Sequence, residues 1–157
     1  MNFCSDNVAG VSPEIIQALS DANTGPAMPY GDDDITQRVI GCLQDLFETD
    51  AEILFMSTGS SANALALATM TPPYGSVYCH PESHVNVDEC GAPEFFTGGA
   101  KLVSVPGTDG KMTPEALENA IPGAGVVHHT QPAAVSVTQV TEAGTLYTLD
   151  ELTAIAE

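Results

Sequence analysis

A short polar turn, STGSS at 57–61, separates an apolar run from a segment rich in alanine and leucine. In a strand–turn–helix arrangement, the unpaired amides of the first helical turn and the helix dipole favour a bound anion. A glycine lets the backbone approach such a group closely. The turn lacks the G-K-[ST] ending of a nucleotide P-loop and the spaced glycines of a dinucleotide fingerprint. It predicts an anion site whose candidate residues are Ser57, Thr58, Gly59, Ser60 and Ser61. The alternative is that Ser60 only caps the helix.

Two histidines with acidic neighbours lie in CHPESHVNVDECGAP, residues 79–93. His80 and His84 are four residues apart, but Pro81 between them disfavours the shared helical face that a zinc H-E-x-x-H pair requires. No metal site is therefore predicted. A histidine just past the carboxyl end of a parallel strand lies where ligands bind in open α/β sheets, and its flat ring could stack on an aromatic ring. The alternative is a histidine bonded only to backbone groups.

Two further polar segments could contribute to a site. In QPAAVSVTQVTEAGTLY, residues 131–147, four polar side chains follow a predicted strand: Ser136, Thr138, Gln139 and Thr141. Such side chains either line a pocket or form an ordinary loop. Near the start of the chain, Ser5-Asp6-Asn7 joins a hydroxyl to an Asx-type turn, which by composition predicts only a loop.

Apolar spacing and capping signals place these segments on alternating helices and strands. Helices are predicted at 13–22, after a cap at Asp34 or a neighbouring aspartate, at 60–70, from Thr113-Pro114-Glu115 onward, and from Leu149 onward. Strands are predicted at 53–56, 76–79, 101–105, 125–129 and 134–138, with a polar, partly helical turn around 84–91. This alternation predicts an α/β fold of three layers, α/β/α, in which helices cover both faces of a mostly parallel sheet.

Composition narrows the classes of partner. The 157 residues suit one domain or part of a larger one, and the net charge of -18 arises from 21 acidic residues against only three lysines and arginines. So acidic a surface repels nucleic acid and anionic lipid, which excludes both as partners. No apolar stretch reaches the roughly 18 residues of a membrane helix, and the N-terminus has no signal-peptide features, which predicts a cytoplasmic protein. The four cysteines lack C-x-x-C spacing, which predicts reduced, mostly buried thiols.

Six motifs, in this order, resemble the low-specificity threonine aldolases of the beta-eliminating lyase family. They are FCSDN, MPYGDDD, FMSTGSSANALAL, CHPESHVNVDECGAPEFFTGGAKL, DGKMTPEAL and VSVTQVTEAGTLYTLDEL, and together they span essentially the whole chain. The resemblance implies the aspartate aminotransferase fold type and a pyridoxal 5'-phosphate cofactor. It also implies cleavage of the Cα–Cβ bond of β-hydroxy-α-amino acids, so that threonine gives glycine and acetaldehyde.

The resemblance also implies roles for individual residues. Gly59 and Ser60, with Ser57 and Ser61 as support, match the family's phosphate-binding turn. His84 matches the histidine that stacks on the cofactor ring and acts near the substrate hydroxyl, which makes it both a cofactor-binding and a catalytic candidate. Ser5 matches a residue that helps to hold the substrate carboxylate. Glu89 is a candidate to orient His84 or a water molecule.

The family pattern continues past Glu157 with an aspartate for the pyridine nitrogen, an arginine for the substrate, the Schiff-base lysine and a small C-terminal domain. Lys101, Lys111 and Arg38 match none of these residues. The resemblance therefore implies that residues 1–157 are the N-terminal part of the cofactor-binding large domain, inactive alone. The alternatives are a non-catalytic phosphate- or cofactor-binding remnant and an assembly partner of a full-length relative. The complete enzyme is expected to be a homo-oligomer, a dimer or a tetramer.

Overall fold

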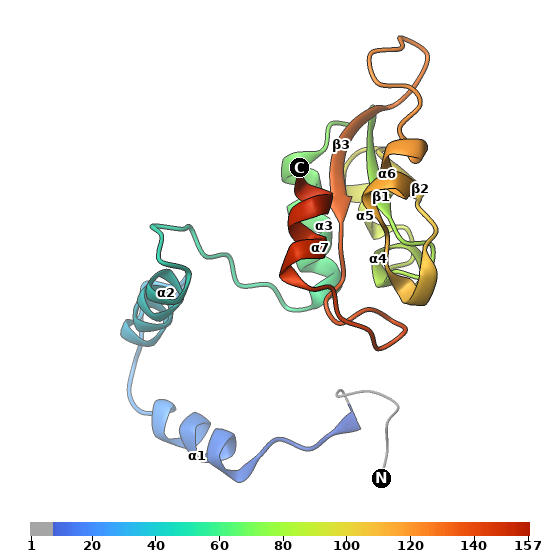
Figure 1. The fold of residues 1–157 in the computed structure, drawn as a ribbon. Helices are drawn as coiled ribbons and strands as arrows, with labels where there is room; N and C mark the ends of the chain where they lie inside the picture. Colours follow the sequence, from blue (N-terminus) through green and yellow to red (C-terminus); the bar gives the residue numbers. More distant parts are fainter. Residues whose placement is uncertain (1–7) are drawn as a thin grey trace. The chain divides into compact units, whose positions relative to one another are not determined.

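A computed structural model describes residues 8–157, which divide into two units. The first unit ends at Leu54, and the second runs from Phe55 to Glu157 (Figure 1). The segment Ser5-Asp6-Asn7, with the substrate-binding candidate Ser5, lies outside the described residues. Each unit is built from its own sequence signals and is described by itself.

The first unit consists of the two helices that its capping residues predict. Helix α1 spans Pro13–Ala22 and begins at Ser12, whose hydroxyl accepts a hydrogen bond from the Ile15 amide at 3.4 Å. Helix α2 spans Asp34–Phe47, and its cap is the neighbouring Asp33. Both helices confirm the sequence prediction. No residue from 8 to 54 is buried, so these helices have no core within the described unit.

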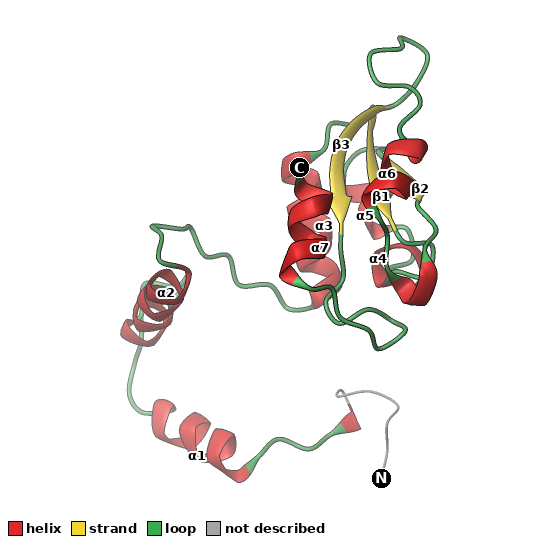
Figure 2. Ribbon diagram, viewed as in Figure 1, coloured by secondary structure: helices red, strands yellow, loops and turns green. Residues whose placement is uncertain are grey.

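The second unit is built on a parallel sheet of three strands in the order β2-β1-β3 (Figure 2). Val77 at the centre of the middle strand pairs with Leu102 on one side and Ala134 on the other. The strands are β1 Gly75–Cys79, β2 Lys101–Ser104 and β3 Gln131–Ser136. Every residue of β1 is buried, as a central strand of a covered parallel sheet requires.

Helices cover both faces of this sheet, which confirms the three-layer prediction for this unit. On one face, Val77 and Cys79 pack with Leu67 and Val85. On the other face, Tyr78 packs with Leu117 and with residues around it, among them Val105, Met112 and Ile155. Four of these packing residues come from helices: Leu67 from α3 Gly59–Met70, Val85 from α4 His84–Val87, Leu117 from α6 Pro114–Ala120 and Ile155 from α7 Leu149–Ala156. The predicted helices at 60–70, from 114 and from 149 are thus confirmed.

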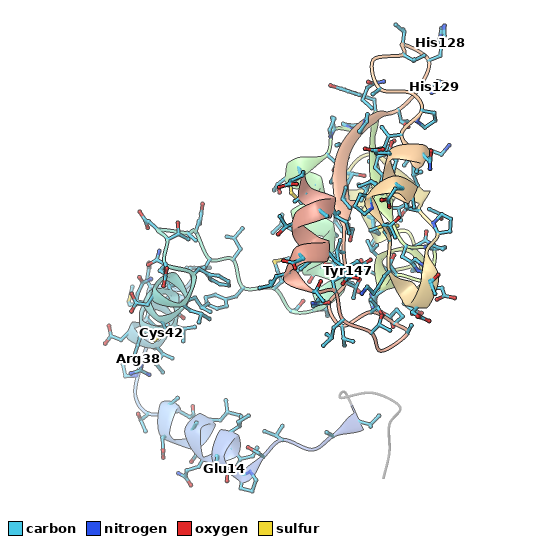
Figure 3. The ribbon with its side chains drawn as sticks, viewed as in Figure 1. Glu14, Arg38, Cys42, His128, His129 and Tyr147 are labelled. Atoms are coloured by element: carbon cyan, nitrogen blue, oxygen red, sulfur yellow. The ribbon has the colours of Figure 1, made fainter. Side chains whose placement is uncertain are left out.

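Two predicted strands are wrong. Residues 53–56 form no strand, because no described strand pairs with them, and the side chains of Leu54, Phe55 and Met56 stay exposed. Residues 125–129 form successive turns, which Gln131 ties together by accepting from the Gly125 amide and donating to the carbonyls of Val126 and His129. This loop carries His128 and His129 away from the sheet (Figure 3).

Three smaller differences complete the comparison. Strand β3 begins at Gln131 rather than at 134 and ends at Ser136. Helix α5, Ala92–Phe96, was not predicted. Of the three cysteines among the described residues, Cys79 is buried while Cys42 and Cys90 are exposed, so the expectation of mostly buried thiols is wrong. Burial raises the pKa of the Cys79 thiol.

No helix within residues 8–157 has the length and apolar character to cross a lipid bilayer.

Candidate functional site

The polar turn leads directly into α3, as predicted, but its cap is Thr58. The Thr58 hydroxyl accepts from the Ser61 amide at 3.1 Å, and the Ser61 hydroxyl accepts from the Thr58 amide at 3.2 Å. This reciprocal capping box occupies Ser61 locally. The alternative in which Ser60 only caps the helix is therefore wrong. Gly59 and Ser60 are the first two residues of the helix, so their amides have no intrahelical acceptor.

Gly59 lies in open space. A Cβ atom built on it would have no heavy atom of residues 8–157 within 4 Å, and the φ of Gly59 lies outside the left-handed region that favours glycine. Neither backbone conformation nor crowding within this chain therefore requires a glycine at this position. A glycine would be required if an external group bound to the first-turn amides, because any side chain at this position would stand between that group and the amides.

His84, the first residue of α4, lies in contact with a buried carboxylate. Its Nδ1 is 2.9 Å from Glu89 Oε1, and Asn63 Nδ2 donates to the same oxygen at 2.6 Å. The Glu89 side chain is fully buried, whereas that of His84 is 45% exposed. Glu89 Oε2 is buried and has no hydrogen-bond partner among the described residues. The arrangement holds the imidazole by one edge and leaves the other edge accessible.

The surroundings of His84 favour its protonated form. The hydrogen bond that His84 donates to Glu89 raises the pKa of His84 above its ordinary value of 6.5, and the charges of Glu89, Glu142 and Asp88 act in the same direction. Partial burial opposes this shift. The imidazole is thus a stronger base than a free histidine side chain, and it stays charged to a higher pH.

His80, four residues earlier, has a different environment. It is 6% exposed and follows the last residue of β1. Its Nδ1 accepts from the Glu82 amide at 3.2 Å, and its Nε2 lies 3.2 Å from the Gly107 carbonyl, to which it donates. His80 is therefore the histidine bonded only to backbone groups. Within residues 8–157, no group of three or more histidine, cysteine or acidic residues could hold a metal ion.

Gly59, Asn63 and His84 line an open groove of about 380 Å³ at the carboxyl end of the sheet. It joins the start of α3 and the start of α4 to the segment after β3. Its lining residues are Gly59, Asn63, His84, Val85, Ser136, Val137, Thr138, Gln139 and Glu142. Of the two alternatives for the polar side chains after this strand, pocket lining holds for Ser136, Thr138 and Gln139, whereas Thr141 does not line this groove. Ser57 before α3, and Ser60 and Ser61 in its first turn, are not part of the lining.

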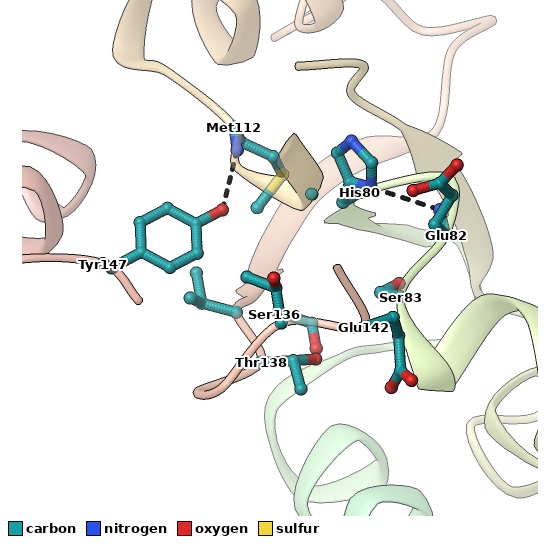
Figure 4. A pocket seen from close by; sticks show the side chains of 11 residues that line it. His80, Glu82, Ser83, Met112, Ser136, Thr138, Glu142 and Tyr147 are labelled. Atoms are coloured by element: carbon teal, nitrogen blue, oxygen red, sulfur yellow. Dashed lines mark hydrogen bonds between the residues drawn. The ribbon is translucent and has the colours of Figure 1, made fainter. Parts of the chain in front are cut away.

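A second, much smaller cavity of about 10 Å³ adjoins the same polar segment (Figure 4). Ser136, Thr138 and Glu142 line both the groove and this cavity, whereas His80 lines only the cavity. On its far side the Tyr147 hydroxyl accepts from the Met112 amide at 2.7 Å. This bond ties the loop before α7 to the segment before α6 and so closes the side of the cavity that the groove does not share.

Sequence reasoning missed Asn63 and Glu142. Asn63 lies four residues after Gly59 on α3, and that spacing places the two on one helical face, which would have been a usable signal. Its partner Glu89 lies 26 residues further along the chain, and no local pattern indicates the contact.

Neither described lysine lines the groove. Lys101 is the first residue of β2 and so lies at the amino edge of the parallel sheet, whereas the groove lies at the carboxyl edge. Lys111 donates from Nζ to Glu151 Oε2 at 2.7 Å and to the Leu146 carbonyl at 3.1 Å. It also lies 5.4 Å from the centre of the Tyr147 ring. All three contacts hold Lys111 away from the groove.

Comparisons with known proteins agree with one another. A family model described as beta-eliminating lyase matches residues 2–157. The low specificity L-threonine aldolases of Pseudomonas aeruginosa and of a Pseudomonas species are 44% and 43% identical to this chain over 154 residues. These matches cover 98% of this chain and 44% of each relative. A solved structure of Leishmania major threonine aldolase matches with a TM-score of 0.87 and 29% identity, over 95% of this chain and 43% of that one. The chain therefore spans less than half the length of these relatives.

Proposed function

This chain belongs to the beta-eliminating lyase family, and on that premise we propose that it forms the N-terminal part of the cofactor-binding large domain of a threonine-aldolase-like lyase. The reaction is cleavage of the Cα–Cβ bond of β-hydroxy-α-amino acids with pyridoxal 5'-phosphate, so that threonine gives glycine and acetaldehyde. The named low specificity L-threonine aldolases among its relatives support this proposal. The observation that carries it is that Gly59 and His84 line one groove.

The groove residues fit the proposed cofactor by their chemistry. Gly59 and Ser60 offer first-turn amides to the phosphate, and the hydroxyls of Ser57 and Ser60 are additional donors. Ser61 contributes by closing the capping box that shapes the turn. His84 offers a flat, half-exposed ring for stacking. When bound, pyridoxal phosphate supplies an electron sink for the bond that breaks.

His84 is the residue that handles the proton. Retro-aldol cleavage requires that the substrate hydroxyl lose its proton, and a base must lie close to accept it. Nδ1 of His84 is engaged by Glu89, so Nε2 is the nitrogen that accepts. The imidazole is neutral only above its raised pKa. The activity of the complete enzyme should therefore increase as the pH rises through the pKa of His84, as a pH–rate profile would reveal.

We propose that residues 1–157 alone do not catalyse the reaction. The chemistry needs a lysine at the cofactor, and Lys101 and Lys111 both lie away from the groove. A missing covalent or electrostatic group typically lowers the rate by about 10²- to 10⁴-fold. The expected activity of this chain toward threonine is therefore at or near background.

The test is to add pyridoxal phosphate to the purified chain and to record its absorption spectrum and binding isotherm. Borohydride treatment and intact mass follow. We expect reversible binding without a fixed mass increase at one lysine. In Gly59→Glu, a carboxylate occupies the anion site, so affinity should fall about tenfold or more, whereas the matched control Gly41→Glu on α2 should bind as the wild type does.

Two results would contradict these proposals separately. A stoichiometric mass increase at Lys101 or Lys111 would disprove catalytic incompleteness. Equal affinity of the wild type and Gly59→Glu, or no binding by either, would disprove the proposed phosphate site.

A non-catalytic binding module is the second candidate function. It is favoured by the absence of a lysine from the groove lining, together with the open first-turn amides at Gly59. Inorganic phosphate should then raise the melting temperature as effectively as pyridoxal phosphate does, because only the phosphate is recognised. A clearly larger shift with pyridoxal phosphate would favour the lyase proposal, since that shift requires ring contacts as well.

We further propose that the complete enzyme is a cytoplasmic homo-oligomer, a dimer or a tetramer. The resemblance to the threonine aldolases supports this proposal. Strand β3 has no further partner within the described sheet, so residues 1–157 alone should associate with another chain through this unpaired edge. Light scattering coupled to size exclusion tests this proposal, which a compact monomer of the complete enzyme would contradict.

A further inference from the structure

Two side chains of the second unit, Asn63 and His84, converge on one buried oxygen of a third, Glu89. Glu89 follows α4, and its Oε1 accepts both from Asn63 on α3 and from His84 Nδ1. The next residue, Cys90, has a φ of 51°, in the left-handed region that a non-glycine residue rarely adopts. The chain thus turns sharply just where the Glu89 side chain enters the interior.

The donors at Glu89 determine where the proton of a neutral His84 lies. The Asn63 amide nitrogen can only donate, so Oε1 acts as an acceptor toward it. A carboxylate oxygen in this role accepts from His84 Nδ1 as well, so Nδ1 carries the hydrogen. Nε2 then has the lone pair, and no described residue bonds to it.

His80 has the opposite arrangement. Its Nδ1 accepts from the Glu82 amide, so its hydrogen is on Nε2, where it faces the Gly107 carbonyl. Two histidines four residues apart therefore hold opposite tautomers, which provides an internal reference.

We propose that Asn63 is a positioning residue that, through Glu89, holds neutral His84 in its Nδ1–H form with Nε2 free to accept a proton. The inference concerns this chain's own side chains; only the identity of the proton donor, the substrate hydroxyl, rests on the proposed function. In that step the hydroxyl proton passes to Nε2, the hydroxyl oxygen keeps the electron pair, and the resulting imidazolium keeps its Nδ1–H on Glu89. The charges that face His84, on Glu89, Asp88 and Glu142, are all negative and stabilise that cation.

Asn63 matters because Glu89 has so few donors. Within residues 8–157, Oε2 has no partner, and both hydrogen bonds of the buried carboxylate fall on Oε1. Loss of the Asn63 donor frees the carboxylate to rotate about its terminal bond and leaves His84 as its only partner in that part of the chain. The orientation of the imidazole is then no longer fixed from two sides.

Nitrogen-15 NMR of histidine-labelled chain, without cofactor and at a pH where His84 is neutral, tests the proposal. The ring nitrogen shifts report which nitrogen carries the hydrogen, and His84→Gln and His80→Gln assign the signals. We expect Nδ1–H for His84 and Nε2–H for His80. Free histidine side chains favour Nε2–H, so Glu89→Leu should return His84 to that form, with a change of about tenfold or more in the tautomer ratio.

Asn63→Leu and Asn63→Ala should shift the ratio in the same direction by a severalfold smaller amount, because neither side chain can donate a hydrogen bond to Glu89. Asn86→Leu is the matched control, because Asn86 lies on α4 and donates to the Pro81 carbonyl at 2.7 Å rather than to Glu89. It should leave the tautomer unchanged.

An Nε2–H form of His84 in the wild type would overturn the proposal, as would unchanged tautomer ratios in both folded Asn63 variants. Asn63 is exposed on α3 and alanine favours a helix, so Asn63→Ala tests the positioning role even if Asn63→Leu fails to fold. The measurement needs no pyridoxal phosphate. Disproof of the proposed phosphate site would therefore not affect the tautomer result. Disproof of the proposed tautomer would likewise not affect the phosphate site.

Discussion

The two units of this chain are alike in secondary structure and differ in burial. Helices α1 and α2 begin at capping residues just as α3 and α6 do. Yet no residue from 8 to 54 is buried, whereas the buried apolar side chains, such as Val77, Cys79 and Val105, all lie in the second unit. The comparison teaches that local signals are enough to place a helix, while a core and a site require segments that are distant in sequence.

This difference has an energetic consequence. Full burial of an aliphatic side chain stabilises a protein by about 1.5–3 kcal/mol, and helices without such burial are marginal in water at these lengths. The second unit should therefore account for the cooperative unfolding of the chain, and the first should open locally. Four experiments test this difference in stability between the two units.

The largest expected effect is on amide hydrogen exchange. Amides of β1 should exchange only through global unfolding, which typically requires about 5 kcal/mol or more, whereas those of α1 and α2 should exchange through local opening of low cost. Protection should thus differ by about 10³-fold or more between β1 and α2, as measured residue by residue by NMR. Comparable protection in the two units would refute the contrast.

The next effect concerns the core. Leu67 is 5% exposed and packs against β1, so Leu67→Ala should lower the free energy of unfolding by about 2–5 kcal/mol in urea denaturation. Leu46 on α2 is 71% exposed, and Leu46→Ala should change it by at most about 0.5 kcal/mol. If the two variants lost similar stability, the first unit would be part of the cooperative core.

Capping gives a smaller effect. Thr58→Ala removes the acceptor for the Ser61 amide at the start of α3 and should lower the free energy of unfolding by about 1 kcal/mol. Ser12→Ala removes the equivalent acceptor at α1 and should weaken that helix locally, without changing global unfolding. Circular dichroism and urea denaturation of both variants separate the two outcomes. A global loss in Ser12→Ala would show that α1 unfolds together with the sheet.

The smallest effect is the pH dependence that His84 contributes. Its pKa is raised in the folded state, so its stabilisation is fully present below the unfolded value of about 6.5 and is lost as the pH rises through the folded value. The stability difference between the wild type and His84→Asn should therefore shrink with rising pH across that window. Because the side chain is 45% exposed, the change should be modest. A difference that grows with pH would mean that Glu89 does not stabilise the imidazolium.

Much of the fold could be predicted because its signals are local. Ser12, Thr113 and the aspartates before α2 cap helices through bonds within three residues. The strand predictions failed where they needed a partner: the apolar run 53–56 and the valines of 125–129 have β-forming residues but no paired strand. For the candidate site, the turn at Gly59 and the polar residues after β3 were visible in the sequence. The contact of Asn63 with Glu89 was not.

The helices, the parallel α/β pattern, the family and the residue types available for chemistry could be predicted from the amino-acid sequence, because their signals come from residues near one another along the chain. Which histidine faces the groove and which is held by backbone groups depends on tertiary contacts. Such contacts also decide which nitrogen of His84 carries its hydrogen. The reason is physical: a hydrogen bond between Asn63 and Glu89 spans 26 residues of sequence and exists only once α3 and α4 pack on the same face of the sheet.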